Sequence, residues 1–125
     1  MKFIVLSHGN FALELIEVSK MVFGTYKNVV CFGLQTGMAT EDFLNLVQSE
    51  LEKTKEPILF LCDIKGGTPF NVANLLSKGR PEIKLIYGIN VPLFLELLSH
   101  IEENDLNQLL NEVKESICGT IGIIP

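Results

Sequence analysis

The chain has 125 residues, of which 47 % are hydrophobic and 20 % charged, and its formal net charge is −5. This length and composition predict one globular domain over residues 1–125. The negative charge argues against a nucleic-acid-binding surface, which would need a basic face, and no apolar run is long enough to span a membrane. Cys31, Cys62 and Cys118 lack metal-ligand spacing, so we expect a cytoplasmic protein with reduced thiols and no metal or other cofactor.

Apolar runs of strand character alternate with segments of helical periodicity along the chain. The expected strands cover residues 3–6, 28–32, 58–62 and 83–87. Three helices are expected to begin at Asn10, Thr40 and Thr68. Two more are expected to begin at or just before Pro92 and near Asp105. Such alternation with short connections indicates βαβ units on a parallel sheet. The predicted fold class is therefore a three-layer α/β fold, with a mainly parallel sheet of order 2-1-3-4 and helices on both faces.

Two finer predictions concern the first helix and the end of the chain. Phe11, Leu15, Val18 and Val22 recur at three- and four-residue spacing, which predicts that they form the buried face of the first helix. Residues 117–124 have strand character and are too few for another helix. We therefore expect them to form an additional edge strand.

His8 and Asp63 are the candidate catalytic pair, because each follows a strand of the predicted sheet. Strands 1 and 3 are neighbours in the order 2-1-3-4, and ligands bind at the carboxyl ends of such strands. A neutral imidazole has one nitrogen with a free lone pair, and a carboxylate that accepts the other N–H fixes the tautomer. His8 as an ordinary core histidine and Asp63 as a turn cap are the simpler alternatives. Their shared position at the predicted switch point favours the functional interpretation.

The segment Gly66-Gly67-Thr68-Pro69 is the candidate anion site. Two glycines allow backbone N–H groups to approach a ligand, while Thr68 suits the N-cap and Pro69 the first helical position. Alone, such a turn is only a good helix start. Beside His8 and Asp63 it would bind a phosphoryl group through Gly66, Gly67 and the Thr68 hydroxyl.

Further residues are placed at the same rim by the predicted topology. These secondary candidates are Gly9, Asn71 and Asn90. The segment from Gly88 to Pro92 either shapes the site or simply starts a helix, and the sequence favours neither. His100 lies at the end of a predicted helix, where a capping role is expected.

Three segments carry a resemblance to a known family: Ser7-His8-Gly9, the run Asp-Ile-Lys-Gly-Gly-Thr-Pro-Phe-Asn over residues 63–71, and Gly-Ile-Asn-Val-Pro over residues 88–92. The chain resembles, over nearly its whole length, the enzyme IIA domain of the mannose-type (mannose/fructose/sorbose) sugar phosphotransferase system. It departs from some members at Lys65, where others can have an aromatic residue, and this affects the expected partner-contact surface.

The resemblance implies a phosphotransferase that carries a phosphoryl group on a histidine. His8 would accept the group from the phosphocarrier protein HPr and pass it to the IIB domain of the same system, for uptake of a mannose-class sugar. Asp63 would orient His8, and Thr68 would contact the phosphate. The resemblance also implies a homodimer in which residues 117–124 can be exchanged between subunits. Contact with the membrane would occur only through the IIC and IID components.

Other functions remain open at this point. The phosphotransfer subunit of a dihydroxyacetone kinase system would use the same histidine. A response-regulator receiver also has an aspartate after strand 3, at the position that Asp63 occupies here. A receiver, however, needs an acidic pair after strand 1 to bind Mg²⁺, and this chain has Ser7-His8 there. A purely regulatory or binding domain would keep the fold without phosphoryl transfer.

Overall fold

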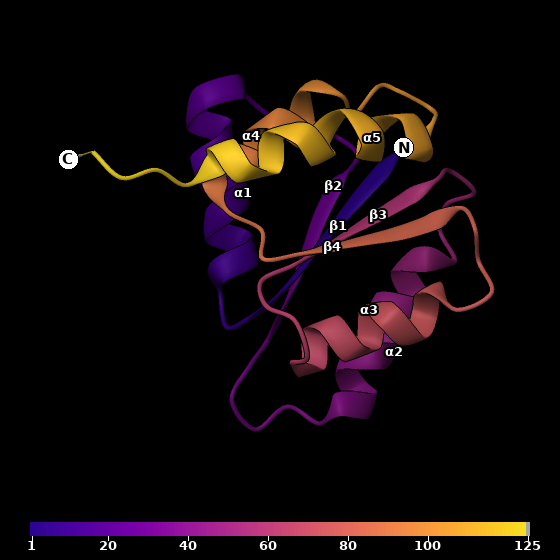
Figure 1. Cartoon of the computed structure of the whole chain (residues 1–125). Coiled ribbons are helices and arrows are strands. Elements are labelled where there is room, and N and C mark those ends of the chain that lie inside the picture. Colours follow the sequence, from indigo (N-terminus) through magenta and orange to yellow (C-terminus); the bar gives the residue numbers. More distant parts are fainter. Residues whose placement is uncertain (125) are drawn as a thin grey trace.

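A four-stranded parallel sheet forms the centre of the computed structural model, which describes residues 1–124 (Figure 1). Its strands are β1 (Lys2–His8), β2 (Val29–Leu34), β3 (Ile58–Cys62) and β4 (Ile83–Tyr87). Their order is β2-β1-β3-β4, which confirms the predicted topology. β1 and β3 are neighbours, with Leu6 opposite Cys62, so the chain segments that follow them begin side by side.

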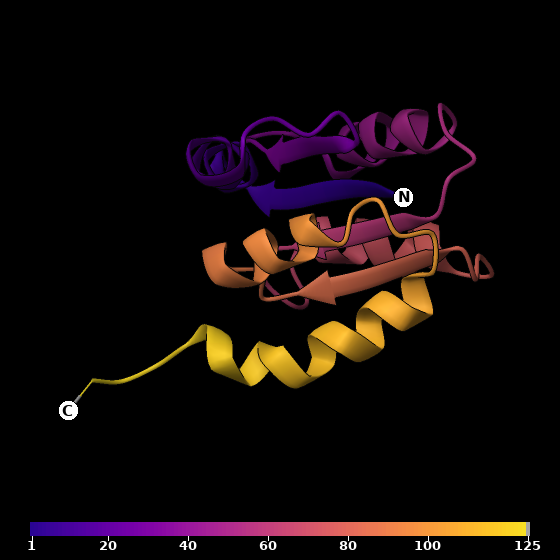
Figure 2. The ribbon, with the colours of Figure 1, turned by 90° about the horizontal axis from the view of Figure 1, so that it is seen from above.

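Helices cover both faces of this sheet (Figures 1 and 2). One face is covered by α1 (Phe11–Phe23), α4 (Val91–Ser99) and α5 (Leu106–Ser116), and the other by α2 (Thr40–Leu51) and α3 (Thr68–Ser77). Side chains of β1 alternate between the two cores, because successive residues of a strand point to opposite faces. Phe3 and Val5 pack on one side, and Ile4 and Leu6 on the other. Within residues 1–124, no helix combines the length and the apolar character needed to cross a membrane.

The buried face of α1 differs from the prediction. Phe11, Val18 and Val22 are 43 %, 37 % and 59 % exposed. The buried residues are instead Ala12, Leu15 and Ser19, so only Leu15 was assigned correctly. The apolar spacing fitted two overlapping stripes, and the helix is turned so that its small residues Ala12 and Ser19 pack against the protein. The buried Ser19 hydroxyl is satisfied by donating to the carbonyl of Ile16 at 2.7 Å.

The predicted C-terminal strand is also wrong for the isolated chain. Residues Ile117–Thr120 form a short 3₁₀ helix, η1, directly after α5, and residues 121–124 form no strand. A strand needs a neighbouring strand to satisfy its backbone groups. Figure 2 shows the tail leading away from the sheet. Exchange of this tail between subunits remains a prediction.

Candidate functional site

His8 and Asp63 lie in direct contact at the carboxyl ends of β1 and β3. The Oδ2 atom of Asp63 is 2.8 Å from His8 Nδ1 and accepts the His8 backbone N–H at 2.8 Å. The other oxygen, Oδ1, accepts the backbone N–H of Ile64 at 2.8 Å. The carboxylate is thus fixed by three hydrogen bonds, two of which come from His8. This is the juxtaposition that the strand order predicted.

The Asp63 carboxylate determines which nitrogen of a neutral His8 ring carries the proton. Burial alone would raise the pKa of the Asp63 carboxyl, but hydrogen bonds from the His8 backbone, the His8 ring and Ile64 hold this pKa below its ordinary value. Asp63 is therefore ionised at neutral pH and can only accept a hydrogen bond, so the proton of the ring lies on Nδ1. The Nε2 lone pair is then free. The His8 side chain is 46 % exposed and the Asp63 side chain 15 %. The imidazole ring is therefore accessible to a partner, whereas the Asp63 carboxylate that contacts it is largely buried.

Gly67 packs against the imidazole edge that carries Nε2. A Cβ atom at this position would lie 2.6 Å from His8 Cε1 and 3.1 Å from Nε2, so any side chain here would force the ring or the turn to move. The preceding Gly66 has a φ of +84°, in the region that favours glycine. Steric constraints therefore explain why both positions of the predicted anion turn are glycine. At Gly67 the backbone lies directly beside the candidate nucleophile.

The start of α3 differs in one detail from the prediction. The N-cap is Gly67, and Thr68 is the first helical residue, with Pro69 following it. No side chain caps this helix end, so no capping side chain accepts the first N–H groups of α3. An uncapped helix N-terminus favours anions. Asn71 supports the turn, since its Nδ2 donates to the Gly66 carbonyl at 3.4 Å.

Asn90 has a structural role in this molecule. Its Oδ1 accepts the Leu93 N–H at 3.0 Å and so caps α4, while its Nδ2 donates to the Thr120 hydroxyl at 3.0 Å. The segment from Gly88 to Pro92 therefore leads into a helix, as one of the two interpretations expected. A contribution of this segment to the site stays a prediction. Asn90 also ties the C-terminal η1 to the rim of the sheet.

Two residues that sequence reasoning missed shape the loop after His8. The Ser7 side chain is buried, and its Oγ accepts the Ala12 N–H at 2.8 Å, which anchors the start of α1. A Cβ at Gly33 would lie 2.0 Å from the carbonyl oxygen of Gly9, so β2 and this loop are in backbone contact. Gly9 has a φ of +55° and donates its N–H to Leu34 at 2.8 Å. A serine next to a helix start was a readable signal, whereas the Gly33 contact depends on strand register.

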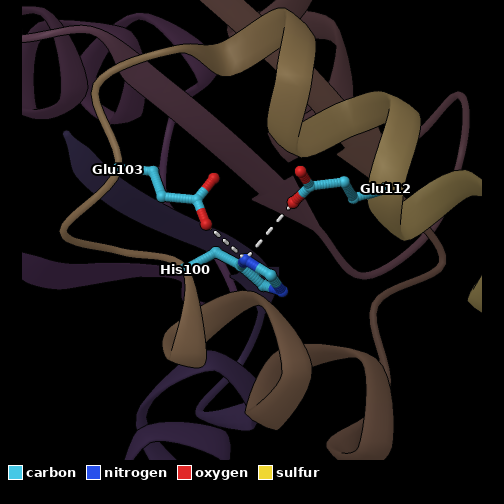
Figure 3. A group of neighbouring side chains, drawn as sticks. All are labelled: His100, Glu103 and Glu112. Carbon is cyan, nitrogen blue, oxygen red and sulfur yellow. Dashed lines mark hydrogen bonds and ion pairs between the residues drawn. The ribbon is translucent and has the colours of Figure 1, made fainter.

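The second histidine of the chain lies in a different environment. His100 is the C-cap of α4, in agreement with the expected role. Its Nδ1 is 2.7 Å from Glu103 Oε1 and 3.5 Å from Glu112 Oε2 (Figure 3). Glu112 belongs to α5, so these contacts join α5 to the end of α4 that is remote from the rim. We interpret them as a structural link between the two helices.

The chain is thus an α/β protein in which an exposed histidine contacts a carboxylate at the switch point of a parallel sheet, beside an uncapped helix start. The family described as "PTS system fructose IIA component" (EIIA-man) matches residues 2–114. The chain therefore belongs to the mannose-type IIA family of the sugar phosphotransferase system (PTS). Members of this family are phosphotransferases that work with other PTS proteins in sugar uptake.

Individual relatives agree with this assignment. The chain is 34 % identical over 113 residues to the PTS system fructose-specific EIIA component of Bacillus subtilis, covering 89 % of this chain and 77 % of the relative. It is 30 % identical over 97 residues to the mannose-specific EIIAB component of Escherichia coli, covering 76 % of this chain but 30 % of that protein. The crystal structure of EIIA from Streptococcus agalactiae has a TM-score of 0.88 and 32 % identity, covering 98 % of this chain and 95 % of that chain.

Proposed function

We propose that this chain is a phosphohistidine carrier. His8 accepts a phosphoryl group from HPr and passes it to the IIB domain of the same system, for uptake and phosphorylation of a mannose-class sugar. The observation that carries this proposal is the contact between His8 Nδ1 and Asp63 Oδ2 at 2.8 Å, which directs the free lone pair of Nε2 outward. The proposed location is the cytoplasm, with the membrane reached only through the IIC and IID components.

The proposed transfer needs only the groups at this rim. The Nε2 lone pair attacks the phosphorus of the phosphorylated donor, an N–P bond forms, and the bond from phosphorus to the donor breaks with its electron pair returning to the donor. The His8 ring becomes positively charged, and the adjacent Asp63 carboxylate stabilises that charge. Attack by a nucleophile of the IIB domain then breaks the N–P bond and restores neutral His8. Because Nδ1 keeps its proton throughout, no separate base is required.

The phosphoryl oxygens would be bound by the start of α3. The backbone at Gly67 lies beside Nε2, and the dipole of α3 favours negative charge at this helix start. The hydroxyl of Thr68, the first residue of α3, is the further donor that we propose. These donors would stabilise both the transferring group and the phosphorylated state.

The proposal is tested by incubation with enzyme I, HPr and labelled phosphoenolpyruvate. Wild type and His100→Ala should become labelled, whereas His8→Ala should not, since His100 belongs to the link between α4 and α5. The label should be lost in acid and retained in base, as for a phosphohistidine; the phosphoaspartate of a receiver would be lost in base. Equal labelling of His8→Ala and wild type would refute the proposal, and base-labile label would point to the receiver alternative.

We also propose that the chain forms a homodimer through its C-terminal tail. Ile121, Ile123 and Ile124 are 79 %, 93 % and 95 % exposed, an unfavourable arrangement for apolar side chains in water. Among residues 1–124, β4 is an edge strand that pairs only with β3, and an edge strand presents backbone groups that an added strand can pair with. If the tail of one subunit paired with β4 of the other, the exposed isoleucines would be covered. The same pairing would give hydrogen-bond partners to the backbone groups at the edge of β4.

A further inference from the structure

The link between α4 and α5 gathers one imidazole and two carboxylates at one point (Figure 3). His100 is the C-cap of α4, Glu103 lies in the loop that follows, and Glu112 belongs to α5. One ligand atom from each residue can be chosen so that all three atoms lie within 4.8 Å of one another. Imidazole nitrogens and carboxylate oxygens are common ligands of Zn²⁺ and related ions. These side chains therefore have the type and the spacing that a metal site requires.

Within the described residues, no lysine or arginine forms an ion pair with either carboxylate. The ion pairs of Glu103 and Glu112 are those with His100. One imidazole carries at most a single positive charge, and a neutral ring carries none. The cluster thus keeps a net negative charge, and carboxylates held close together repel each other. A divalent cation bound by both carboxylates would remove this repulsion.

One oxygen of the Glu103 carboxylate is left without a partner. Oε1 lies 2.7 Å from His100 Nδ1, but Oε2 is buried and has no hydrogen-bond partner among residues 1–124. A buried carboxylate oxygen costs free energy unless a donor or a cation satisfies it. Both oxygens of one carboxylate can bind the same ion, so a cation held at Glu103 would satisfy Oε2. This observation is independent of the spacing of the three ligands.

Neighbouring groups orient the three side chains. The backbone N–H of Glu103 donates to the His100 carbonyl at 2.9 Å, which keeps these two residues in one tight turn. Gln108 Nε2 donates to Oε1 of Glu112 at 2.8 Å, while Oε2 of Glu112 is the atom that lies 3.5 Å from His100 Nδ1. Hydrogen bonds behind the ligands orient them toward a metal in this way. The three side chains are 27 %, 37 % and 41 % exposed, so an ion and a water ligand can reach them.

We propose that His100, Glu103 and Glu112 form a binding site for a divalent transition-metal ion, of which Zn²⁺ fits best. Zn²⁺ binds nitrogen and oxygen ligands tetrahedrally at about 2.0–2.2 Å, which places the ligand atoms roughly 3.3 Å apart. Nδ1 of His100 and Oε2 of Glu112 are already close to this separation at 3.5 Å. Glu103 must move away from the ring by a fraction of an ångström, and water supplies the fourth ligand.

Binding exchanges the proton on His100 Nδ1 for the ion. The N–H bond breaks, the nitrogen lone pair binds Zn²⁺, and Nε2 takes up a proton, so a neutral ring releases none overall. The bound ion would join the end of α4 to α5, the helix that leads directly into η1. The inference departs from the expectation of a metal-free chain, which rested on the spacing of the cysteines. It does not depend on the proposed function, because the site lies at the end of α4 that is remote from the rim.

The test is a calorimetric titration of the full chain with zinc chloride under reducing conditions. The background carries Cys118→Ser, which removes the exposed thiol as a competing ligand. One ion should bind per chain. His100→Asn, Glu103→Gln and Glu112→Gln should each weaken zinc binding by at least about tenfold, and circular dichroism shows whether each variant is folded.

Matched controls separate ligation from net charge. Glu102→Gln lies beside Glu103, and Glu115→Gln lies on α5; both residues are exposed, and both changes remove one negative charge. These variants should bind zinc like the background protein. Mn²⁺ should bind more weakly than Zn²⁺, and Mg²⁺ should not compete, because it prefers oxygen ligands alone. Saturating zinc should also raise the Tm by at least about 3 °C, since the three ligands come together only in the folded chain.

Nitrogen NMR of the histidine rings locates the ion without any substitution, because His8 and His100 are the two histidines of the sequence. Zinc should shift the Nδ1 resonance of His100 and leave His8 unchanged. A shift at His8 alone, or the absence of any binding, would overturn the inference. Control variants that lose as much affinity as the ligand variants would overturn it as well. None of these results bears on the phosphorylation of His8, which is measured separately.

Discussion

A single oxygen atom of Asp63 holds His8 at two points, because Oδ2 lies 2.8 Å from the ring Nδ1 and accepts the backbone N–H at 2.8 Å. The carboxylate therefore fixes the residue and its ring together. An imidazole bound only through Nδ1 could still shift with its backbone. Here the end of β1 and the orientation of the ring are set by the same group.

Asp63→Asn should slow phosphoryl transfer by at least about tenfold while leaving the fold intact, because an amide can present its NH₂ to Nδ1 and so favour the wrong tautomer. Single-turnover transfer from phosphorylated HPr measures the rate, and circular dichroism measures the fold. Transfer kinetics equal to those of wild type would exclude the orienting role.

Gly67→Ala should impair transfer more than its effect on stability explains. The added methyl group would lie 2.6 Å from His8 Cε1, so the ring must rotate away from Asp63 or the turn must move. Gly119→Ala is the matched control, since nothing lies within 4 Å of a Cβ there. The comparison uses transfer rates and denaturant unfolding of both variants. A normal rate in Gly67→Ala would show that the turn yields without disturbing the ring.

Glu50 should make a pH-dependent contribution to stability. Its carboxylate binds Lys2 Nζ and Lys53 Nζ, the latter at 2.8 Å, and these hydrogen bonds lower its pKa against the opposing effect of burial. A carboxyl whose folded pKa is lowered stabilises the fold above its unfolded pKa, and this stability is lost as the pH falls through the folded pKa. Glu50→Gln should thus cost about 1–3 kcal/mol at neutral pH, and the difference from wild type should shrink below about pH 4. Urea unfolding at several pH values measures both; a difference that does not vary with pH would contradict the assignment.

Two substitutions separate the two roles of Asn90. Asn90→Ala removes the cap of α4 and the bond to Thr120, and should lower the free energy of unfolding by about 1 kcal/mol or more. Thr120→Val keeps the cap of α4 but removes the tether between Asn90 and η1, together with the hydrogen bond from the Thr120 hydroxyl to the Ile117 carbonyl. It should cost less, while increasing amide exchange in η1. Equal losses in both variants would assign the whole effect to the tether.

Deletion of residues 121–125 tests the proposed dimer. The deletion removes the three exposed isoleucines of the tail and should convert a dimer into a monomer in analytical ultracentrifugation. Phosphorylation of His8 should persist, because the contacts of His8 and Asp63 lie within one chain. A deletion variant that remains dimeric would show that another surface forms the interface.

Much of the fold followed from local patterns. The wholly apolar run Ile58–Cys62 could only be a strand buried on both faces, and it set the parallel topology and the neighbouring positions of His8 and Asp63. The face of α1 could not be read in the same way. Its apolar residues outnumber the positions that the core can accept, and small residues such as Ala12 and Ser19 decide how closely a helix packs.

At the site, residue types were predictable and contacts were not. Glycines at 66 and 67 indicated an anion turn, but the closeness of Gly67 to the His8 ring depends on how α3 packs on β1. The tail from 117 to 124 had strand character because apolar residues favour strands. Whether it becomes one depends on pairing with the edge of a sheet, and in the isolated chain residues 117–124 pair with no strand.

The position of His8 at the end of β1 has a consequence for motion. β1 is hydrogen-bonded to β2 on one side and β3 on the other, and Phe3, Ile4, Val5 and Leu6 have no exposed surface. Such a segment opens only when the whole domain unfolds, so the amides of β1 should be among the slowest to exchange with deuterium. The Nε2 atom of His8 is then displaced only by rotation about the two side-chain bonds of this residue. If His8 accepts a phosphoryl group as proposed, most of the movement that brings phosphorus and nitrogen together must come from the arriving molecule.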